Sequence, residues 1–205
     1  MDKLLVLNWK MNPCFLREAE ELAEKENQKG VIICAPYVYL HLSEISGAQN
    51  MHQEKKGAHT GAISGNMLKD LGIKYVLIGH SELNEEPEIA NKKARLAIKL
   101  GLIPIVCIAQ GQEIEVKVKN LKGEFIIAYE PAEEEQPQNS DLAWEMSILI
   151  RKKLRPSQRR TKILYGGDVT LKNCLDYHKL DGLLLGQASL NYKKFLKIYA
   201  RLNKN

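Results

Sequence analysis

The chain has 205 residues, of which 44% are hydrophobic and 27% charged, and its formal net charge is +5. A chain of this length and composition can bury one sizeable core, so we expect one domain over residues 1–205. The longest apolar run, at residues 102–109, is far too short to cross a membrane, and the first residues are unlike a signal peptide. We therefore expect a soluble, cytoplasmic protein without a membrane partner.

Short apolar segments recur along the whole chain, and most of them do not alternate with polar residues. Continuous apolar runs are typical of parallel strands that are buried on both faces. We expect strands at residues 3–8, 31–35, 44–49, 74–79, 103–108, 124–129, 161–165 and 181–186.

The first segment between these strands, residues 12–30, has the pattern of an amphipathic helix. It carries Pro13 near its start and Gly30 at its end, which are common positions for proline and glycine around a helix. Its apolar residues are expected to face the core together: Phe15, Leu16, Ala19, Leu22 and Ala23.

Further helices are expected along the chain. Residues 85–101 repeat the same design, and residues 139–154 begin at a capping Asn139 or Ser140 and end in cations that suit the helix dipole. Residues 109–123 have room for one short helix only.

Strands that alternate with helices in this way make a parallel α/β fold. Eight uninterrupted units favour a closed (β/α)8 TIM barrel over an open sheet, and the chain lacks the Gly-rich dinucleotide motif of many open sheets. Such barrels typically have about 250 residues, so we expect a shortened barrel.

Two further classes of site are disfavoured by the spacing of residues. The four cysteines show no Cys-x-x-Cys pair and the five histidines are scattered, so we expect free thiols and no metal site. Basic residues gather at 151–162 without interleaved aromatic residues, as in a solvated helix end, so we expect no nucleic-acid partner.

Polar residues follow the strands at their carboxyl ends, where such barrels carry their functional sites. Asn8 and Lys10 follow the first strand, His80 and Glu82 the fourth, and Glu130 the sixth. Each residue alone has an ordinary alternative, as a solvated cation, a hydrogen-bonded core histidine or a cap. Because all five are expected on one rim, we interpret them as parts of one site.

These residue types suit proton transfer next to a carbonyl group. Glu130 can remove the proton, and His80 can polarise the carbonyl as a neutral imidazole. Lys10 can stabilise the oxygen anion that develops. The turns around Gly167 and Gly186 are either simple turn formers or phosphate-binding loops that use backbone N–H groups.

The order of the motifs resembles that of the triosephosphate isomerase family. The matching blocks are "NWKMN" at 8–12, "GAQN" at 47–50, "KGAHTGAIS" at 56–64, "DLGIKYVLIGHSE" at 70–82, "AYEP" at 128–131, "YGGDV" at 165–169 and "DGLLLGQASL" at 181–190. The resemblance covers nearly the whole chain.

This resemblance implies the interconversion of dihydroxyacetone phosphate and glyceraldehyde 3-phosphate without a cofactor. It implies Glu130 as the catalytic base and His80 as the electrophile, the residue pair for which the family is known. It further implies that Lys10 and Asn8 contact the substrate and that Glu82 supports the site. It implies that the substrate phosphate binds the segments that contain Gly167, Asp168, Gly186 and Gln187.

Several positions depart from the family pattern. The segment 130–140 is shorter than the family's mobile lid and lacks its Gly-Thr-Gly-Lys tip. Asp168 stands where a serine is expected, Gln187 where a second glycine is expected, and Leu83 where an arginine is expected. Residues 109–110 are Ala-Gln in place of Gly-Glu. We therefore expect the proton-transfer residues to be kept and the binding of the substrate phosphate to be weakened.

These departures leave two alternatives open. One is the same proton transfer on another small sugar, such as one without phosphate, and the other is a non-catalytic barrel that binds or scaffolds. We expect Asp168 to cap a short helix at 170–177 and to repel the phosphate. The acids Glu133, Glu134 and Glu135 would add repulsion only if their loop folds inward.

The block at residues 56–64 resembles the family's third loop, which docks into the neighbouring subunit. The resemblance therefore implies a homodimer. His59 and Ala62 replace commoner residues in this block, so we expect a weaker contact between the subunits.

Overall fold

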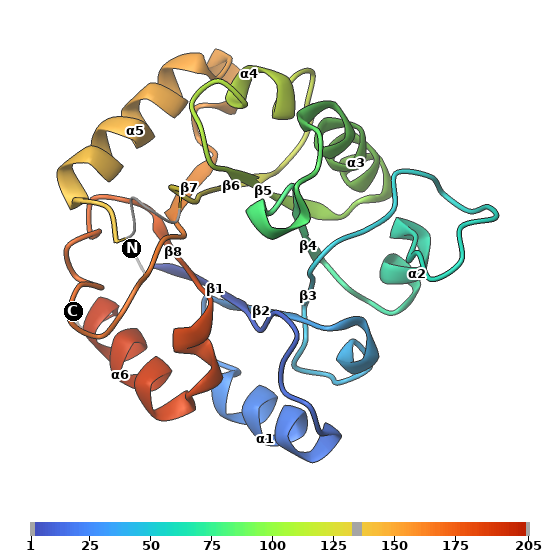
Figure 1. The fold of residues 1–205 in the computed structure, drawn as a ribbon, viewed down its shortest axis with the longest axis horizontal. Helices are drawn as coiled ribbons and strands as arrows, with labels where there is room; N and C mark the ends of the chain where they lie inside the picture. Colours follow the sequence, from blue (N-terminus) through green and yellow to red (C-terminus); the bar gives the residue numbers. More distant parts are fainter. Residues whose placement is uncertain (1–2, 133–136, 204–205) are drawn as a thin grey trace.

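The computed structural model describes residues 3–132 and 137–203, and Figure 1 shows its strands surrounded by helices. All strands run parallel and pair in chain order, and β8 pairs with β1, so that the sheet closes. They are β1 (Leu4–Asn8), β2 (Val31–Ala35), β3 (Gly47–Ala48), β4 (Tyr75–Ile78), β5 (Ile103–Ile108), β6 (Ile126–Tyr129), β7 (Lys162–Tyr165) and β8 (Gly182–Leu185). The predicted (β/α)8 barrel is confirmed.

Helices pack around the outside of the barrel. They are α1 (Leu16–Glu26), α2 (Gly65–Asp70), α3 (Pro87–Leu100), α4 (Ile114–Lys117), α5 (Ser140–Lys153) and α6 (Tyr192–Leu202), with 3₁₀ turns η1 (Tyr37–Tyr39), η2 (Ser81–Leu83), η4 (Pro156–Gln158) and η5 (Gln187–Leu190). Gly101 ends α3 with a φ of 83°, and the Asn139 side chain accepts the Asp141 N–H at the start of α5. Among the described residues, no helix is long and apolar enough to span a membrane.

The barrel is shortened where full helices are replaced by turns. Between β2 and β3 the chain forms only η1. The short helix predicted at 170–177 is absent from the described structure, which has turns there. The Asn173 side chain accepts the Thr170 N–H at 2.7 Å and donates to the Asp168 carbonyl at 2.9 Å. Such local side-chain bonds compete with a helix.

The core has two layers, because strand residues point alternately into the barrel and towards the helices. The interior contains Val6, Ile32, Cys34, Leu77, Ile105, Cys107, Ile126, Ala128, Leu164 and Leu184. The outer layer packs the opposite strand faces against the helices, as Leu5 and Leu7 do beside Val6. Burial on both faces explains why the strands read as continuous apolar runs.

The prediction for the first helix was wrong at its start. Ala19, Leu22 and Ala23 are buried as expected, but Phe15 is 68% exposed and Leu16 46% exposed. Phe15 precedes α1 in an extended conformation, so its side chain does not continue the helical face. Periodicity alone does not tell where a helix begins.

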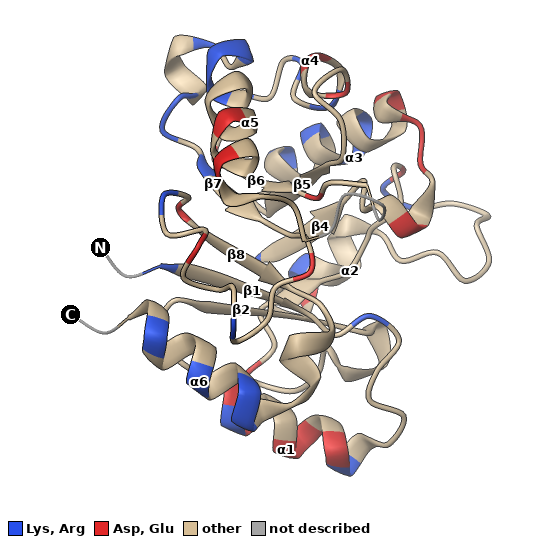
Figure 2. Cartoon of the chain, turned by 60° about the vertical axis from the view of Figure 1, so that its left-hand side comes forward, with Lys and Arg blue, Asp and Glu red and all other residues tan. Residues whose placement is uncertain are grey.

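The basic segment at 151–162 is largely exposed, as expected for a solvated helix end, and some of its cations are also paired. Figure 2 shows basic residues near the end of α5 and along α6. Arg151 binds the Asp181 carboxylate at 2.5 Å and also the carbonyls of Arg159 and Thr161. Lys153 pairs with Glu115. Several of these cations therefore hold the end of α5 to neighbouring segments.

Candidate active site

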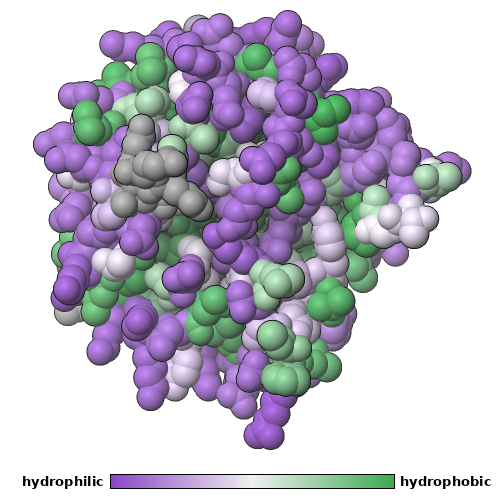
Figure 3. All heavy atoms as spheres, viewed as in Figure 1, coloured by the Kyte–Doolittle hydropathy of each residue, from purple (hydrophilic) through white to green (hydrophobic). Residues whose placement is uncertain are grey.

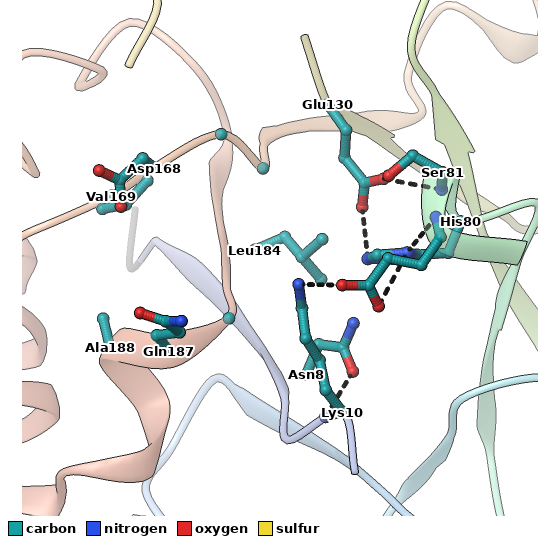
Figure 4. A pocket seen from close by; sticks show the side chains of 14 residues that line it. Asn8, Lys10, His80, Ser81, Glu130, Asp168, Val169, Leu184, Gln187 and Ala188 are labelled. Carbon is teal, nitrogen blue, oxygen red and sulfur yellow. Dashed lines mark hydrogen bonds and ion pairs between the residues drawn. The ribbon is translucent and has the colours of Figure 1, made fainter. Parts of the chain in front are cut away.

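A pocket of about 430 Å³ opens at the carboxyl ends of the strands. The structure brings every predicted site residue to its wall: Asn8, Lys10, His80, Glu82, Glu130, Gly167, Asp168, Gly186 and Gln187. Parallel strands place their carboxyl ends on one rim, which explains how positions so far apart in the chain meet. Figure 4 shows His80 and Glu130 on one side of the pocket and Asp168 and Gln187 on the other.

Glu130 directly follows β6 and points into the pocket from a buried position. Its side chain is almost fully buried, and its N–H donates to the Ile108 carbonyl of β5 at 2.9 Å. One carboxylate oxygen lies 3.4 Å from Nε2 of His80, and the other lies near the hydroxyl and N–H of Ser81, at 3.4 and 3.5 Å. Ser81 is a contact that sequence reasoning missed, although it lies within the "GHSE" block.

The environment of Glu130 makes it a stronger base than an exposed glutamate. Burial raises the pKa of its carboxyl group above the usual range. His80, a hydrogen bond from the Cys107 thiol and the Ser81 N–H oppose that rise. Cys107 was interpreted from sequence as a packing residue, and it also contacts this carboxylate.

Hydrogen bonding determines which nitrogen of His80 carries the proton. The Glu82 N–H donates to Nδ1 of His80 at 3.3 Å, so Nδ1 must offer its lone pair. A neutral imidazole then has its proton on Nε2, which faces Glu130 and the pocket. His80 is therefore arranged to donate a hydrogen bond into the pocket.

Lys10 is held in place by both its side chain and its backbone. Its ammonium lies 2.5 Å from the Glu82 carboxylate, and its N–H donates to the Asn8 side chain at 3.0 Å. Its φ of 54° is uncommon for a lysine, and Gln49 stabilises this turn by donating to the Lys10 carbonyl. Gln49 is a second residue that sequence reasoning did not single out.

The opposite wall of the pocket is built from backbone turns. Gly167 must be a glycine, because a Cβ there would lie 2.2 Å from the Tyr165 hydroxyl. Gly186 precedes η5, which begins at Gln187. Asp168 is exposed, and no hydrogen bond joins its carboxylate to the described residues. The predicted capping role of Asp168 is therefore wrong, since no helix follows it.

The segment after Glu130 is described only in part. Glu133, Glu134 and Glu135 lie outside the described residues. At its far end, the Gln138 N–H donates to the Tyr165 hydroxyl at 2.9 Å, and the Tyr177 hydroxyl donates to the Gln138 carbonyl at 2.8 Å. The two tyrosine rings stack with their centroids 3.8 Å apart. Across the described ranges, no His, Cys, Asp or Glu cluster is arranged to hold a metal ion.

Comparison with known proteins relates the chain to one family. The family model described as "Triosephosphate isomerase" matches residues 3–202. The triosephosphate isomerase of Wolbachia pipientis wMel is 35% identical over 236 residues, with 100% of this chain and 96% of the relative covered. That of Clostridium botulinum (strain Loch Maree / Type A3) is 36% identical over 239 residues, with 93% and 96% covered. That of Aquifex aeolicus (strain VF5) is 34% identical over 244 residues, with 97% and 98% covered.

The three alignments are longer than the 205 residues of this chain. The relatives therefore have segments without a counterpart here. This difference agrees with the turns that replace helices between β2 and β3 and between β7 and β8.

Proposed function

Because the chain belongs to the triosephosphate isomerase family, we propose that it interconverts dihydroxyacetone phosphate and glyceraldehyde 3-phosphate. The observation that carries the proposal is the 3.4 Å approach of Nε2 of His80 to the buried carboxylate of Glu130. A base and a hydrogen-bond donor at this spacing suit proton transfer between two neighbouring carbon atoms.

In the proposed reaction, Glu130 removes a proton from the carbon next to the substrate carbonyl. The electron pair of that C–H bond forms the double bond of an enediolate, and the carbonyl oxygen becomes negative. The Nε2–H of His80 and the ammonium of Lys10 stabilise this oxygen. Nε2 of His80 then gives its proton to this oxygen and takes the proton of the neighbouring hydroxyl in exchange, which moves the negative charge to the second oxygen. Glu130 returns its proton to the adjacent carbon, the second oxygen becomes the new carbonyl, and the reaction needs no net oxidation or reduction.

Burial assists the base in two ways. Burial moves the pKa of the Glu130 carboxyl group towards neutral pH. A carboxylate with a higher pKa is a stronger base. The dry surroundings also strengthen each hydrogen bond to the developing charge. Glu82 contributes indirectly, because it binds Lys10 and donates its N–H to Nδ1 of His80.

The phosphate of the substrate would lie on the opposite wall. The turns at Gly167 and Gly186 offer backbone N–H groups there, while Asp168 and Gln187 alter the surroundings. The exposed carboxylate of Asp168 favours a second candidate function, which is the same isomerisation of a small sugar without phosphate. A barrel without activity is disfavoured, because Glu130, His80 and Lys10 keep an organised arrangement.

A coupled assay separates these functions. Turnover of glyceraldehyde 3-phosphate well above that of glyceraldehyde supports the proposed function. Equal turnover of the two compounds supports the second candidate. Absence of turnover with either compound, from a chain that is folded by circular dichroism, refutes isomerisation.

We also propose that the protein is a homodimer. Three apolar side chains after β1 and β2 are largely exposed in the single chain: Met11 at 91%, Phe15 at 68% and Val38 at 70%. The loop between β3 and α2 extends away from the barrel, and Figure 3 shows it protruding beyond the surface. A neighbouring subunit that accepts this loop would cover exposed apolar surface.

Sedimentation at micromolar concentration tests the dimer. We expect twice the chain mass of 23.3 kDa, and Val38→Glu should shift the equilibrium towards the monomer. A 23.3 kDa species alone would refute the dimer.

We further propose one domain over residues 1–205, since β1 and β8 close the same barrel. We also propose a cytoplasmic location, which the four free cysteines favour.

A further inference from the structure

Lys117, the last residue of α4, is a buried cation behind the proposed active site. Its ammonium donates to the Gly79 carbonyl at 3.2 Å and to the Cys107 carbonyl at 3.0 Å, and it lies 3.1 Å from the Glu113 carboxylate. Only 4% of Lys117 is exposed. Buried lysines are rare and need partners, and these three partners account for its three N–H groups.

The two carbonyl groups belong to neighbouring strand ends. The described pairing of β4 with β5 ends at Ile78 and Val106. The ammonium of Lys117 bridges the next residue of each strand, Gly79 and Cys107. It therefore joins β4 and β5 at the rim that carries the pocket, one residue beyond the described backbone ladder.

Gly79 shows how closely Lys117 packs against this rim. The glycine has a φ of 69°, and a Cβ there would lie 3.0 Å from Cβ of Ala90 and 3.4 Å from Nζ of Lys117. The backbone thus turns sharply at Gly79, directly before His80. The carbonyl that Lys117 holds belongs to the peptide that links Gly79 to His80.

The same pair of charges also holds the backbone that supports Glu130. Glu113 accepts the Ala109 N–H at 3.1 Å, while Lys117 binds the Cys107 carbonyl. These two contacts flank Ile108, whose carbonyl accepts the Glu130 N–H at 2.9 Å. The Lys117–Glu113 pair thus reaches the peptide before His80 and the backbone on both sides of Ile108.

We propose that Lys117, together with Glu113, is a positioning residue that sets the spacing between His80 and Glu130. The inference rests on the proposed isomerase function. Misplacement of a catalytic group by about 1 Å can cost on the order of 10²-fold in rate. Because Lys117 holds the ends of β4 and β5 together, its loss should slow the chemical step more than it weakens substrate binding.

The charged and titratable groups around Glu130 come from several elements. His80 lies beyond the end of β4, Cys107 on β5 and Lys117 on α4, while the Lys10–Glu82 pair and Asp168 line the rest of the pocket. Loss of the Lys117 cation leaves the Glu113 carboxylate without this partner. Because the Lys117 cation lowers the pKa of Glu130, its loss should raise that pKa and move the acidic limb of the pH–rate profile upwards.

The main test is Lys117→Met, which keeps the length of the side chain and removes its charge. We expect kcat for glyceraldehyde 3-phosphate to fall on the order of 10-fold to 100-fold. We expect KM and the inhibition constant of inorganic phosphate to stay within about twofold, because Lys117 lies on the far side from the phosphate wall. Unchanged kcat and an unchanged pH profile would overturn the proposal.

A matched control removes another lysine that pairs with the same helix. Lys153 binds Glu115 of α4 at 2.9 Å and touches neither strand end. Lys153→Met should therefore leave kcat unchanged. An equal loss of kcat in both variants would mean that α4 acts through general stability, which would overturn a specific role for Lys117.

A double variant separates positioning from charge neutralisation. If Lys117 only neutralises Glu113, Lys117→Met combined with Glu113→Gln should restore kcat, and the proposal fails. If Lys117 positions the strand ends, kcat should stay low in the double variant. Should Lys117→Met not fold by circular dichroism, Lys117→Gln replaces it, with an intermediate fall in kcat expected and an unchanged kcat counting against the proposal.

Failure of this inference can be told apart from failure of the proposed function. The unsubstituted chain tests the function by turnover of glyceraldehyde 3-phosphate. If that chain is active and Lys117→Met keeps full kcat and its pH profile, only the positioning role is refuted. If the unsubstituted folded chain is inactive, both proposals fall.

Discussion

The two walls of the pocket differ in how firmly their polar groups are held. On one wall, Glu130, His80 and Lys10 are fixed by contacts from several strands, and the carboxylate of Glu130 is buried. On the other wall, Asp168 is exposed and no described residue binds its carboxylate. The contrast suggests that this chain kept strict geometry for proton transfer and relaxed the geometry for the phosphate.

The largest expected effect concerns the wall of Glu130. Glu130→Gln keeps the shape of the side chain but removes the base, so kcat should fall on the order of 10²-fold to 10⁴-fold. Steady-state kinetics with glyceraldehyde 3-phosphate measures the loss. Glu145→Gln, at an exposed position of α5, is the control. Near-normal turnover in a folded Glu130→Gln variant would contradict proton abstraction by Glu130.

The next effect is expected at Glu26, a buried residue that binds Trp9, which lies between Asn8 and Lys10 of the same wall in the chain. Glu26 accepts a hydrogen bond from the Trp9 indole at 2.8 Å, and burial raises the pKa of its carboxyl group from 4.5 to about 8. The folded protein therefore holds this proton between pH 4.5 and about 8, whereas the unfolded chain releases it. The contribution of Glu26 to stability should be greatest below pH 4.5 and should fall as the pH rises to about 8, by up to ~5 kcal/mol.

Glu26→Gln tests this dependence, because it removes the titration. Urea unfolding of both proteins between pH 5 and 9 should show the variant gaining stability relative to the parent as the pH rises. Glu24→Gln, on the exposed face of the same helix, should leave the curve unchanged. Parallel curves for the parent and Glu26→Gln would show that Glu26 ionises normally in the folded state.

A smaller effect is expected at the phosphate wall. Asp168→Ser removes a negative charge, which at ~6 Å and an effective dielectric constant of ~20 opposes a phosphate by an upper figure of about 3 kcal/mol. Screening by solvent and salt should reduce this, so we expect about tenfold tighter binding of a phosphate-bearing inhibitor, and a smaller gain at high salt.

Inhibitor titrations at low and high salt measure the effect of Asp168. Asp176→Ser is a matched control, since it removes the same charge from an exposed position that does not line the pocket. Unchanged or weaker binding in Asp168→Ser would mean that the carboxylate does not oppose the phosphate. The phosphate wall would then suit its part of the substrate better than its exposed Asp168 carboxylate indicates.

The smallest effect concerns Gln138, whose backbone binds Tyr165 and Tyr177. Tyr177→Phe removes the hydrogen bond to the Gln138 carbonyl and keeps the ring that stacks on Tyr165. One such bond contributes about 0.5–1.5 kcal/mol. Thermal unfolding should show a loss in this range, and kcat/KM should fall only a few-fold. A loss of kcat as large as that of Glu130→Gln would show that the contact between Tyr177 and Gln138 controls the chemical step.

Much of the barrel and of the pocket could be predicted from local patterns. The strands lie within the predicted segments, because strands buried on both faces require unbroken apolar runs. The third strand is shorter than predicted, at Gly47–Ala48, since the residues before it are mostly polar. The pocket could be predicted because the carboxyl ends of parallel strands meet on one rim.

The sequence alone determined the fold class, the strand positions and which polar residues share the rim, because each of these follows from residue periodicity and strand direction. Only the tertiary structure decided that Phe15 is exposed, that Asp168 caps no helix, and that Lys117 binds the ends of β4 and β5. Residue 79 lies 38 positions before residue 117 in the chain, and its carbonyl meets the Lys117 ammonium only when β4, β5 and α4 pack together. Local patterns encode burial, whereas contacts between distant polar groups depend on how the strands and helices pack.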